Sequence, residues 1–247
     1  MNKRRRVYVT AACATTLALA GVGTDLLVER KAEQRVAEAA GCRLGADVDA
    51  ELRSSFAGLR ALTGRVGTVH LSAPRMRRED LDMALQADLY GVSTDGGASG
   101  GSAAVSVTYA ELGKRLDRSG EADGMAGMTL GSDGTRLTLS GTAGALQVPV
   151  SVRMDLSTTS HAVTLTPRAV NMLGREVAVS ALSALPGAAE FADKLKPRTI
   201  EIGKLPAGVR LTGAEAASDG LLLRFGLTPE ELSGDKGAAC APEGKQA

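Results

Sequence analysis

Aromatic residues are scarce in this chain of 247 residues. They make up 2% of it, with three Phe, three Tyr and no Trp. Proteins that recognise nucleic-acid bases or sugars by stacking need aromatic side chains, so the composition disfavours both classes. The hydrophobic residues nevertheless reach 44% of the chain, which is enough to build a core. The sequence therefore predicts an interior lined almost entirely by Leu, Val, Ala and Met.

Residues that commonly carry catalysis or bind metals are also few. The chain has two histidines and three cysteines, and they do not form the spacings of a zinc site; phosphate-binding and dinucleotide motifs are absent too. Gly97, Ser99 and Gly101 match the G-x-S-x-G pattern, but they sit in a Gly/Ser loop that leads into a strand, whereas a nucleophile elbow leads into a helix. We expect no catalytic residue, no metal and no cofactor. A hydrolase that uses Ser99 or His161 is the least favoured alternative.

Positive charge is concentrated at the start of the chain. Residues 3–6 are Lys-Arg-Arg-Arg, and without these four cations the formal net charge falls from +1 to −3, which disfavours nucleic acid as a partner. An uncharged run over residues 7–23 follows, and Ala18-Leu19-Ala20 within it resembles a cleavage site. This layout predicts a signal peptide or an N-terminal membrane anchor over residues 1–23, and both forms stay open. We therefore expect an extracytoplasmic protein of the cell envelope.

The role expected for each cysteine depends on the predicted export signal. Cys13 lies inside the predicted signal, which leaves Cys42 and Cys240 in the exported part. A pair of cysteines in an oxidising compartment favours one disulfide, Cys42–Cys240. Two unpaired thiols are the alternative.

Apolar residues alternate with polar ones along much of the remaining chain. Leu81 to Leu89 is the longest such run, and similar alternation over 105–107, 137–139, 146–154, 163–165 and 221–225 predicts further half-buried strands. Turns are expected at Ala73-Pro74, Asp133-Gly134 and residues 218–220, and a Gly/Ser loop at 93–102.

Helical patterns are fewer. They cover residues 25–40, a segment that opens with a capping box at Thr108 and Glu111, and residues 176–195. The sequence thus predicts an α+β fold with a long antiparallel sheet. We expect a single domain over residues 24–228, followed by a flexible tail over 229–247.

The aliphatic faces of these strands form the candidate ligand site. A twisted sheet around a helix can leave an elongated cavity, in which an acyl chain gains about 0.8 kcal/mol for each buried CH₂ group. The alternative is that these faces simply pack against each other and the helices. His161 shares the alternation phase of Val163 and is a candidate polar contact to the ligand, whereas His70 is expected to face solvent. The predicted cavity lining is Leu81, Met83, Leu85, Leu89, Val105, Val107, Leu146, Val148, Val150 and Val152.

Several stretches, in order along the chain, resemble one known family. They are residues 64–73 followed by the strand from Leu81, residues 105–112, and residues 205–211 leading to 219–223. Over about residues 25–228 the chain is similar to the LmeA-like phospholipid-binding family of actinobacterial envelope proteins.

This resemblance implies a tubular-lipid-binding-like fold, in which a strongly curved antiparallel sheet wraps around a long N-terminal helix. It also implies a protein that binds phospholipid, associates with the membrane surface and supports envelope lipid or lipoglycan metabolism. A non-catalytic scaffold that stabilises an envelope enzyme without binding lipid is the alternative. We expect no basic cluster outside the signal that would bind a phosphate by charge, so the sequence does not predict the lipid headgroup.

Overall fold

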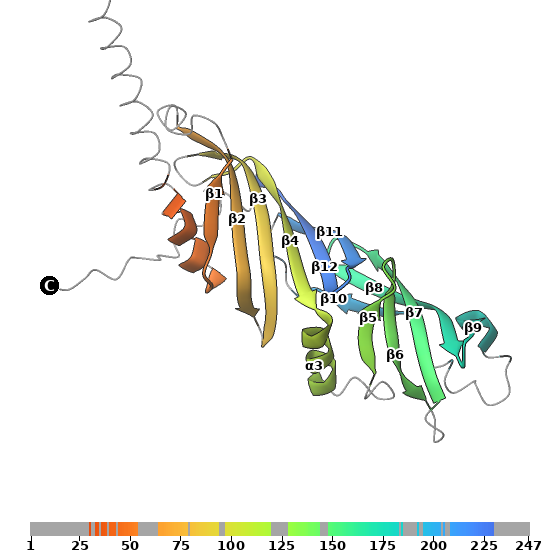
Figure 1. Ribbon diagram of the computed structural model, residues 1–247. Coiled ribbons are helices and arrows are strands. Elements are labelled where there is room, and N and C mark those ends of the chain that lie inside the picture. Colours follow the sequence, from red (N-terminus) through yellow and green to blue (C-terminus); the bar gives the residue numbers. More distant parts are fainter. Residues whose placement is uncertain are drawn as a thin grey trace, which may run out of the picture.

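Two antiparallel sheets of six strands each form the body of the protein in the computed structural model (Figure 1). The structure describes residues 30, 33–34, 36–38, 40–42, 44–53, 64–78, 80–93, 97–119, 128–143, 148–182, 184, 192, 195–203, 205 and 208–229. The first sheet has the order β1 (Asp49–Leu52), β2 (Arg65–Arg78), β3 (Leu81–Ser93), β4 (Gly100–Thr108), β12 (Gly220–Leu227) and β11 (Val209–Ala216). The second sheet has the order β10 (Arg198–Glu201), β8 (Ala162–Met172), β7 (Val148–Thr158), β6 (Leu137–Ala143) and β5 (Thr129–Ser132), with β9 (Arg175–Ala178) paired to β8.

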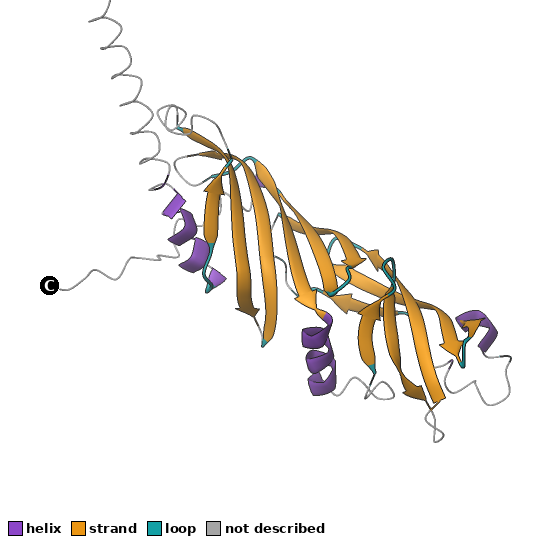
Figure 2. Ribbon diagram, in the orientation of Figure 1, coloured by secondary structure: helices purple, strands orange, loops and turns teal. Residues whose placement is uncertain are grey.

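The sheets lie end to end and give the molecule an elongated shape (Figure 1). β4 leads into α3 (Tyr109–Ser119), and the chain then builds the second sheet before β12 returns to pair with β4. Thr108 Oγ1 accepts the Glu111 backbone N–H at 3.3 Å, so the Thr108 half of the predicted capping box is confirmed. Helices are a minor part of the described chain, as Figure 2 shows.

The core of the second sheet is closed by helices. Val152 and Val170 on the sheet pack with Leu182 of α4 (Val179–Leu182), and their exposed fractions are 1%, 0% and 0%. Tyr109 and Leu112 of α3 join the same cluster. The Tyr109 hydroxyl donates a hydrogen bond to the Ala217 carbonyl at 2.8 Å, and burial raises the pKa of this tyrosine above its ordinary value. The apolar face of this sheet is therefore a packed core.

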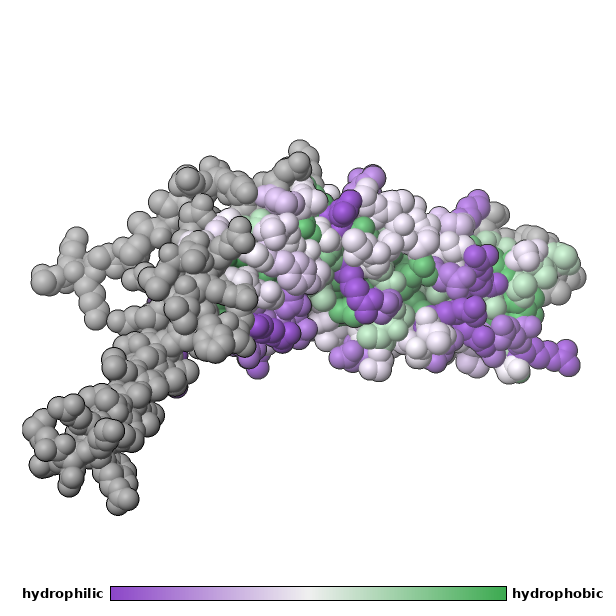
Figure 3. All heavy atoms as spheres, turned by 90° about the horizontal axis from the view of Figure 1, so that it is seen from above, coloured by the Kyte–Doolittle hydropathy of each residue, from purple (hydrophilic) through white to green (hydrophobic). Residues whose placement is uncertain are grey.

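A third group of side chains joins the two sheets. Leu211 and Phe225 of the first sheet pack with Val163 of the second. The Leu211 N–H also donates to the Ser160 carbonyl at 2.8 Å, which ties β11 to the turn between β7 and β8. Hydrophobic residues are nevertheless exposed between hydrophilic ones along the face seen in Figure 3.

The expected single sheet wrapped around a long N-terminal helix is wrong. The described helical residues between 30 and 44 lie beside β1 (Figure 1), where Val36 packs against the cluster of Leu52, Val69 and Val92. The α+β class overstates the helices, because strand predominates in the described residues, although the antiparallel pairing is confirmed. Alternation specifies one apolar face for each strand but does not determine how many sheets the strands form.

Three local predictions also need correction. Ala73-Pro74 is not a turn but lies inside β2 at a bulge, where a proline in a strand is tolerated. Residues 176–178 belong to β9, and the helix predicted from Glu176 begins only at Val179. The expected loop at 93–102 includes the start of β4 at Gly100.

The predicted chain ends lie largely outside the described residues. The predicted signal or anchor over 1–23 is entirely outside them. Of the predicted tail over 229–247, only Pro229 is described. Within the described part of the chain, no helix is long and apolar enough to cross a membrane. Cys42 is exposed, and Cys240 lies outside the described residues, so the Cys42–Cys240 disulfide stays a prediction.

Candidate functional site

One face of the first sheet carries almost only apolar side chains. Residues directly opposite each other in an antiparallel pair point to the same face. Leu85 of β3 lies opposite Ala73 of β2 and Val105 of β4, and Val105 in turn lies opposite Leu223 of β12. The pairing therefore builds one apolar face across four strands; we call this the β3–β4 face, and its predicted members are Leu81, Met83, Leu85, Leu89, Val105 and Val107.

Polar residues occupy the opposite side of the same strands. Asp82, Gln86 and Asp88 alternate with the apolar residues of β3, and Ser102 and Ser106 do so on β4. The long strand predicted from Leu81 is confirmed, because β3 covers Leu81–Ser93. The first sheet is thus amphipathic, with one face suited to water and the other to apolar ligands or packing.

Burial along the β3–β4 face is uneven. Leu81 and Val107 are buried, with 9% and 4% of their surface exposed. Between the ends of β3, Met83 and Leu85 are only half-buried, whereas Val105, equally half-buried on β4, packs against the cluster that joins the two sheets. Two large apolar side chains near the middle of a six-stranded sheet, Met83 and Leu85, therefore keep part of their surface in contact with solvent.

The other predicted cavity residues belong to a different place. Val148 is half-buried, while Val150 and Val152 keep 4% and 1% exposure on the second sheet. Val152 packs in the cluster covered by α3 and α4. It is therefore part of a packed core, which was the alternative to a cavity. Leu146 lies outside the described residues. The structure therefore separates the predicted lining into two groups, one on each sheet.

Neither histidine lies on an apolar face. His161 is exposed in the turn before β8, with its Nδ1 3.0 Å from Ser160 Oγ, so the inward direction expected from its phase is wrong. Its polar contact with a ligand stays a prediction. His70 lies on the polar face of the first sheet, where its Nδ1 is 2.8 Å from Asp88 Oδ1. Part of the His70 side chain stays exposed, so the expected solvent-facing direction is confirmed in part.

Ser99 does not have the surroundings of a nucleophile. Its hydroxyl donates to the Tyr90 carbonyl at 2.9 Å, and the chain continues into β4 rather than into a helix. Within the described residues, no group of three His, Cys, Asp or Glu side chains is placed to hold a metal ion.

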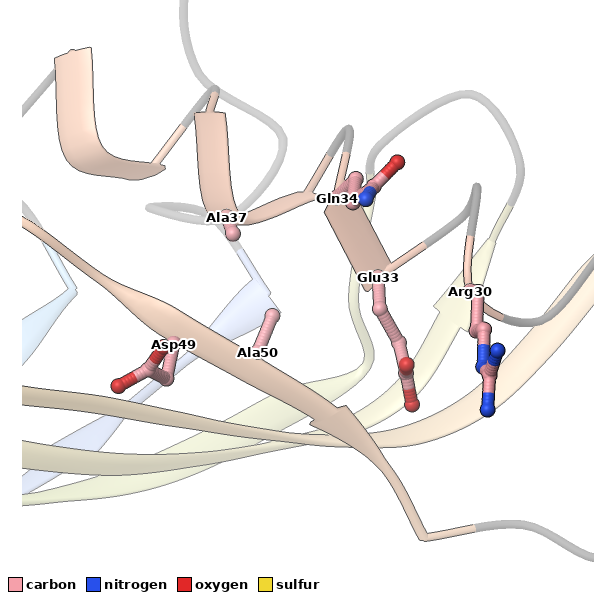
Figure 4. Close-up of a pocket in the computed structure, with 6 residues that line it drawn as sticks. All are labelled: Arg30, Glu33, Gln34, Ala37, Asp49 and Ala50. Carbon is pink, nitrogen blue, oxygen red and sulfur yellow. The ribbon is translucent and has the colours of Figure 1, made fainter.

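A small pocket lies between the helical residues and β1 (Figure 4). Its volume is about 230 Å³, and Figure 4 shows Arg30 and Glu33 on one side and Asp49 and Ala50 on the other. Glu33 Oε1 accepts the Leu52 backbone N–H at 3.1 Å, so this carboxylate already has a structural role. The volume is below the 300–1,000 Å³ typical of small-molecule sites, and the lining is charged. This pocket does not suit an acyl chain.

Comparison with known proteins adds one finding. The model of a family described as LmeA-like phospholipid-binding matches residues 19–225 of the chain. Comparison with curated proteins and with solved structures gives no match.

Proposed function

Because the chain belongs to the LmeA-like phospholipid-binding family, we propose that the β3–β4 face holds the acyl chains of a phospholipid. The observation that carries this proposal is the half-buried state of Met83 and Leu85 on β3. An acyl chain laid on these residues removes apolar surface from water on both sides of the contact, at about 0.8 kcal/mol for each CH₂ group. The proposed activity is binding and not catalysis.

The proposal places the protein outside the cytoplasm. The basic and apolar N-terminal residues support export or anchoring to the envelope, and they fit a role at the membrane surface in envelope lipid or lipoglycan metabolism. The Cys42–Cys240 disulfide belongs to the same proposal, since it requires an oxidising compartment.

Leu85→Asn tests the lipid-binding face. The purified protein is incubated with phosphatidylglycerol vesicles and isolated again, and the retained lipid is measured by mass spectrometry. We expect Leu85→Asn to weaken retention about tenfold, because it puts a polar amide where the acyl chain lies. Gln86→Asn is the matched control, since Gln86 is the next residue on β3 and lies on the polar face. It is expected to retain lipid like the wild type.

Two outcomes would contradict the proposal. One is a wild-type protein that retains no lipid, and the other is equal retention by Leu85→Asn and the wild type. A lipid-free wild type that co-purifies with one envelope enzyme would support the scaffold function instead.

A further inference from the structure

A single arginine stands at one end of the β3–β4 face. At the end of the β2–β3 hairpin, Arg78 lies opposite Leu81, and Arg77 lies opposite Asp82. Opposed side chains share a face of the sheet, so Arg78 lies on the side of Leu81, while Arg77 lies on the polar side. The burial of the neighbouring residues agrees with this assignment of faces, because Met76 and Leu81 on the apolar face are buried and Asp82 on the polar face is exposed.

The two neighbouring arginines differ in their partners. Arg77 Nε lies 3.8 Å from Asp82 Oδ1, and its Nη2 lies 3.6 Å from Asp80 Oδ1. Its charge is therefore balanced by two carboxylates. Arg78 is exposed and, in the part of the chain that the structure describes, has no ion-pair partner. Among the described residues, the end of the apolar face thus carries one cation without a carboxylate partner.

The strand between this cation and the far end of the face is long enough for an acyl chain. From Leu81 to Leu89 it extends about 26 Å at 3.3 Å per residue. One leaflet of a bilayer is about 15 Å of hydrocarbon. A lipid with its headgroup at Arg78 would therefore lay its chains over Met83 and Leu85, the residues left half-buried.

We infer that Arg78 binds the headgroup phosphate of the phospholipid and so orients the ligand on the first sheet. A guanidinium matches a phosphate with two parallel N–H donors, which distinguishes phospholipids from neutral lipids with the same chains. This inference rests on the proposed function, because it assigns one end of the same site. It also gives the ligand a direction, with the phosphate at the β2–β3 hairpin and the chains running toward Leu89.

The test compares two lipids that differ only in the headgroup. The protein is equilibrated with an equimolar mixture of dioleoylphosphatidylglycerol and dioleoylglycerol in nonionic detergent, and mass spectrometry gives the ratio of the two lipids retained. We expect the wild type to prefer the phospholipid and Arg78→Ala to reduce this ratio about tenfold. Arg78→Lys keeps the charge without the planar pair of donors and is expected to fall in between.

Arg77→Ala is the matched control. It removes the same charge one residue away, on the polar face, and is expected to keep the wild-type ratio. Thermal unfolding of each variant verifies that the fold is intact.

The outcomes separate the headgroup site from the acyl-chain site. A wild type that retains both lipids without preference would overturn the assignment of Arg78 while leaving the proposed function in place. An unchanged ratio in Arg78→Ala, or an equal loss in Arg77→Ala, would do the same. A wild type that retains neither lipid would overturn both.

Discussion

The apolar face of the second sheet is covered by α3 and α4, whereas the β3–β4 face of the first sheet keeps Met83 and Leu85 partly exposed. Both sheets are built from strands with the same alternation of apolar and polar residues. Val170 on the second sheet is completely buried, while Leu85 occupies an equivalent apolar position and is not. Alternation alone therefore does not distinguish a structural core from a binding surface. The distinction depends on what lies over the face.

The largest expected effect tests whether the second sheet carries the stability. Leu182→Ala should lower the free energy of unfolding by about 3–4 kcal/mol, because it opens a cavity in a fully buried cluster. Met83→Ala on the first sheet should cost only about 1 kcal/mol, since part of that side chain already contacts water. Urea denaturation measures both values. Equal losses in the two variants would show that Met83 is packed as tightly as Leu182.

A smaller effect is expected where α3 joins the second core to the first sheet. Tyr109→Phe removes the hydrogen bond to the Ala217 carbonyl and should lower the free energy of unfolding by about 1 kcal/mol at neutral pH.

The Tyr109 contribution should also depend on pH. Burial raises the pKa of Tyr109 above its ordinary value of 10.0, so the folded state favours the protonated hydroxyl. The stability that this group contributes is present below pH 10 and is lost as the pH rises through the folded pKa. Denaturation of both proteins from pH 7 to 11 should therefore show their difference shrinking at the alkaline end. A difference that stays constant to pH 11 would contradict this account.

The smallest effect concerns an exposed apolar residue of the second sheet. Leu173, in the turn between β8 and β9, is 76% exposed and has a φ of 51°, a left-handed conformation that disfavours leucine. Asparagine tolerates this conformation, so Leu173→Asn should raise the free energy of unfolding by about 0.5–1 kcal/mol. Leu173→Ala is the control, because alanine keeps the Cβ strain and should give no gain of this kind. A loss of stability in Leu173→Asn would show that the leucine makes a contact that outweighs its strain.

Much of the local structure can be predicted from the sequence, but less of the candidate site. The strand from Leu81 and the start of α3 at Tyr109 follow from contacts between near neighbours, and both are confirmed. The turn expected at Pro74 is wrong because a bulge in β2 accommodates this proline, and a bulge depends on the partner strand. Val150 and Val152 share the alternation pattern of Leu85, yet they belong to the other sheet.

The order of residues specifies which side of each strand is apolar, since successive side chains in a strand point to opposite faces. It also specifies where α3 begins, because Thr108 and Glu111 are three residues apart. The division of the strands into two sheets is a property of the tertiary fold, and so is the cover that α3 and α4 give to the second core while Met83 and Leu85 on the first sheet stay half-buried. Only strand pairing placed Arg78 beside Leu81 and Arg77 beside Asp82. These outcomes depend on contacts between residues far apart in the chain, which no local pattern specifies.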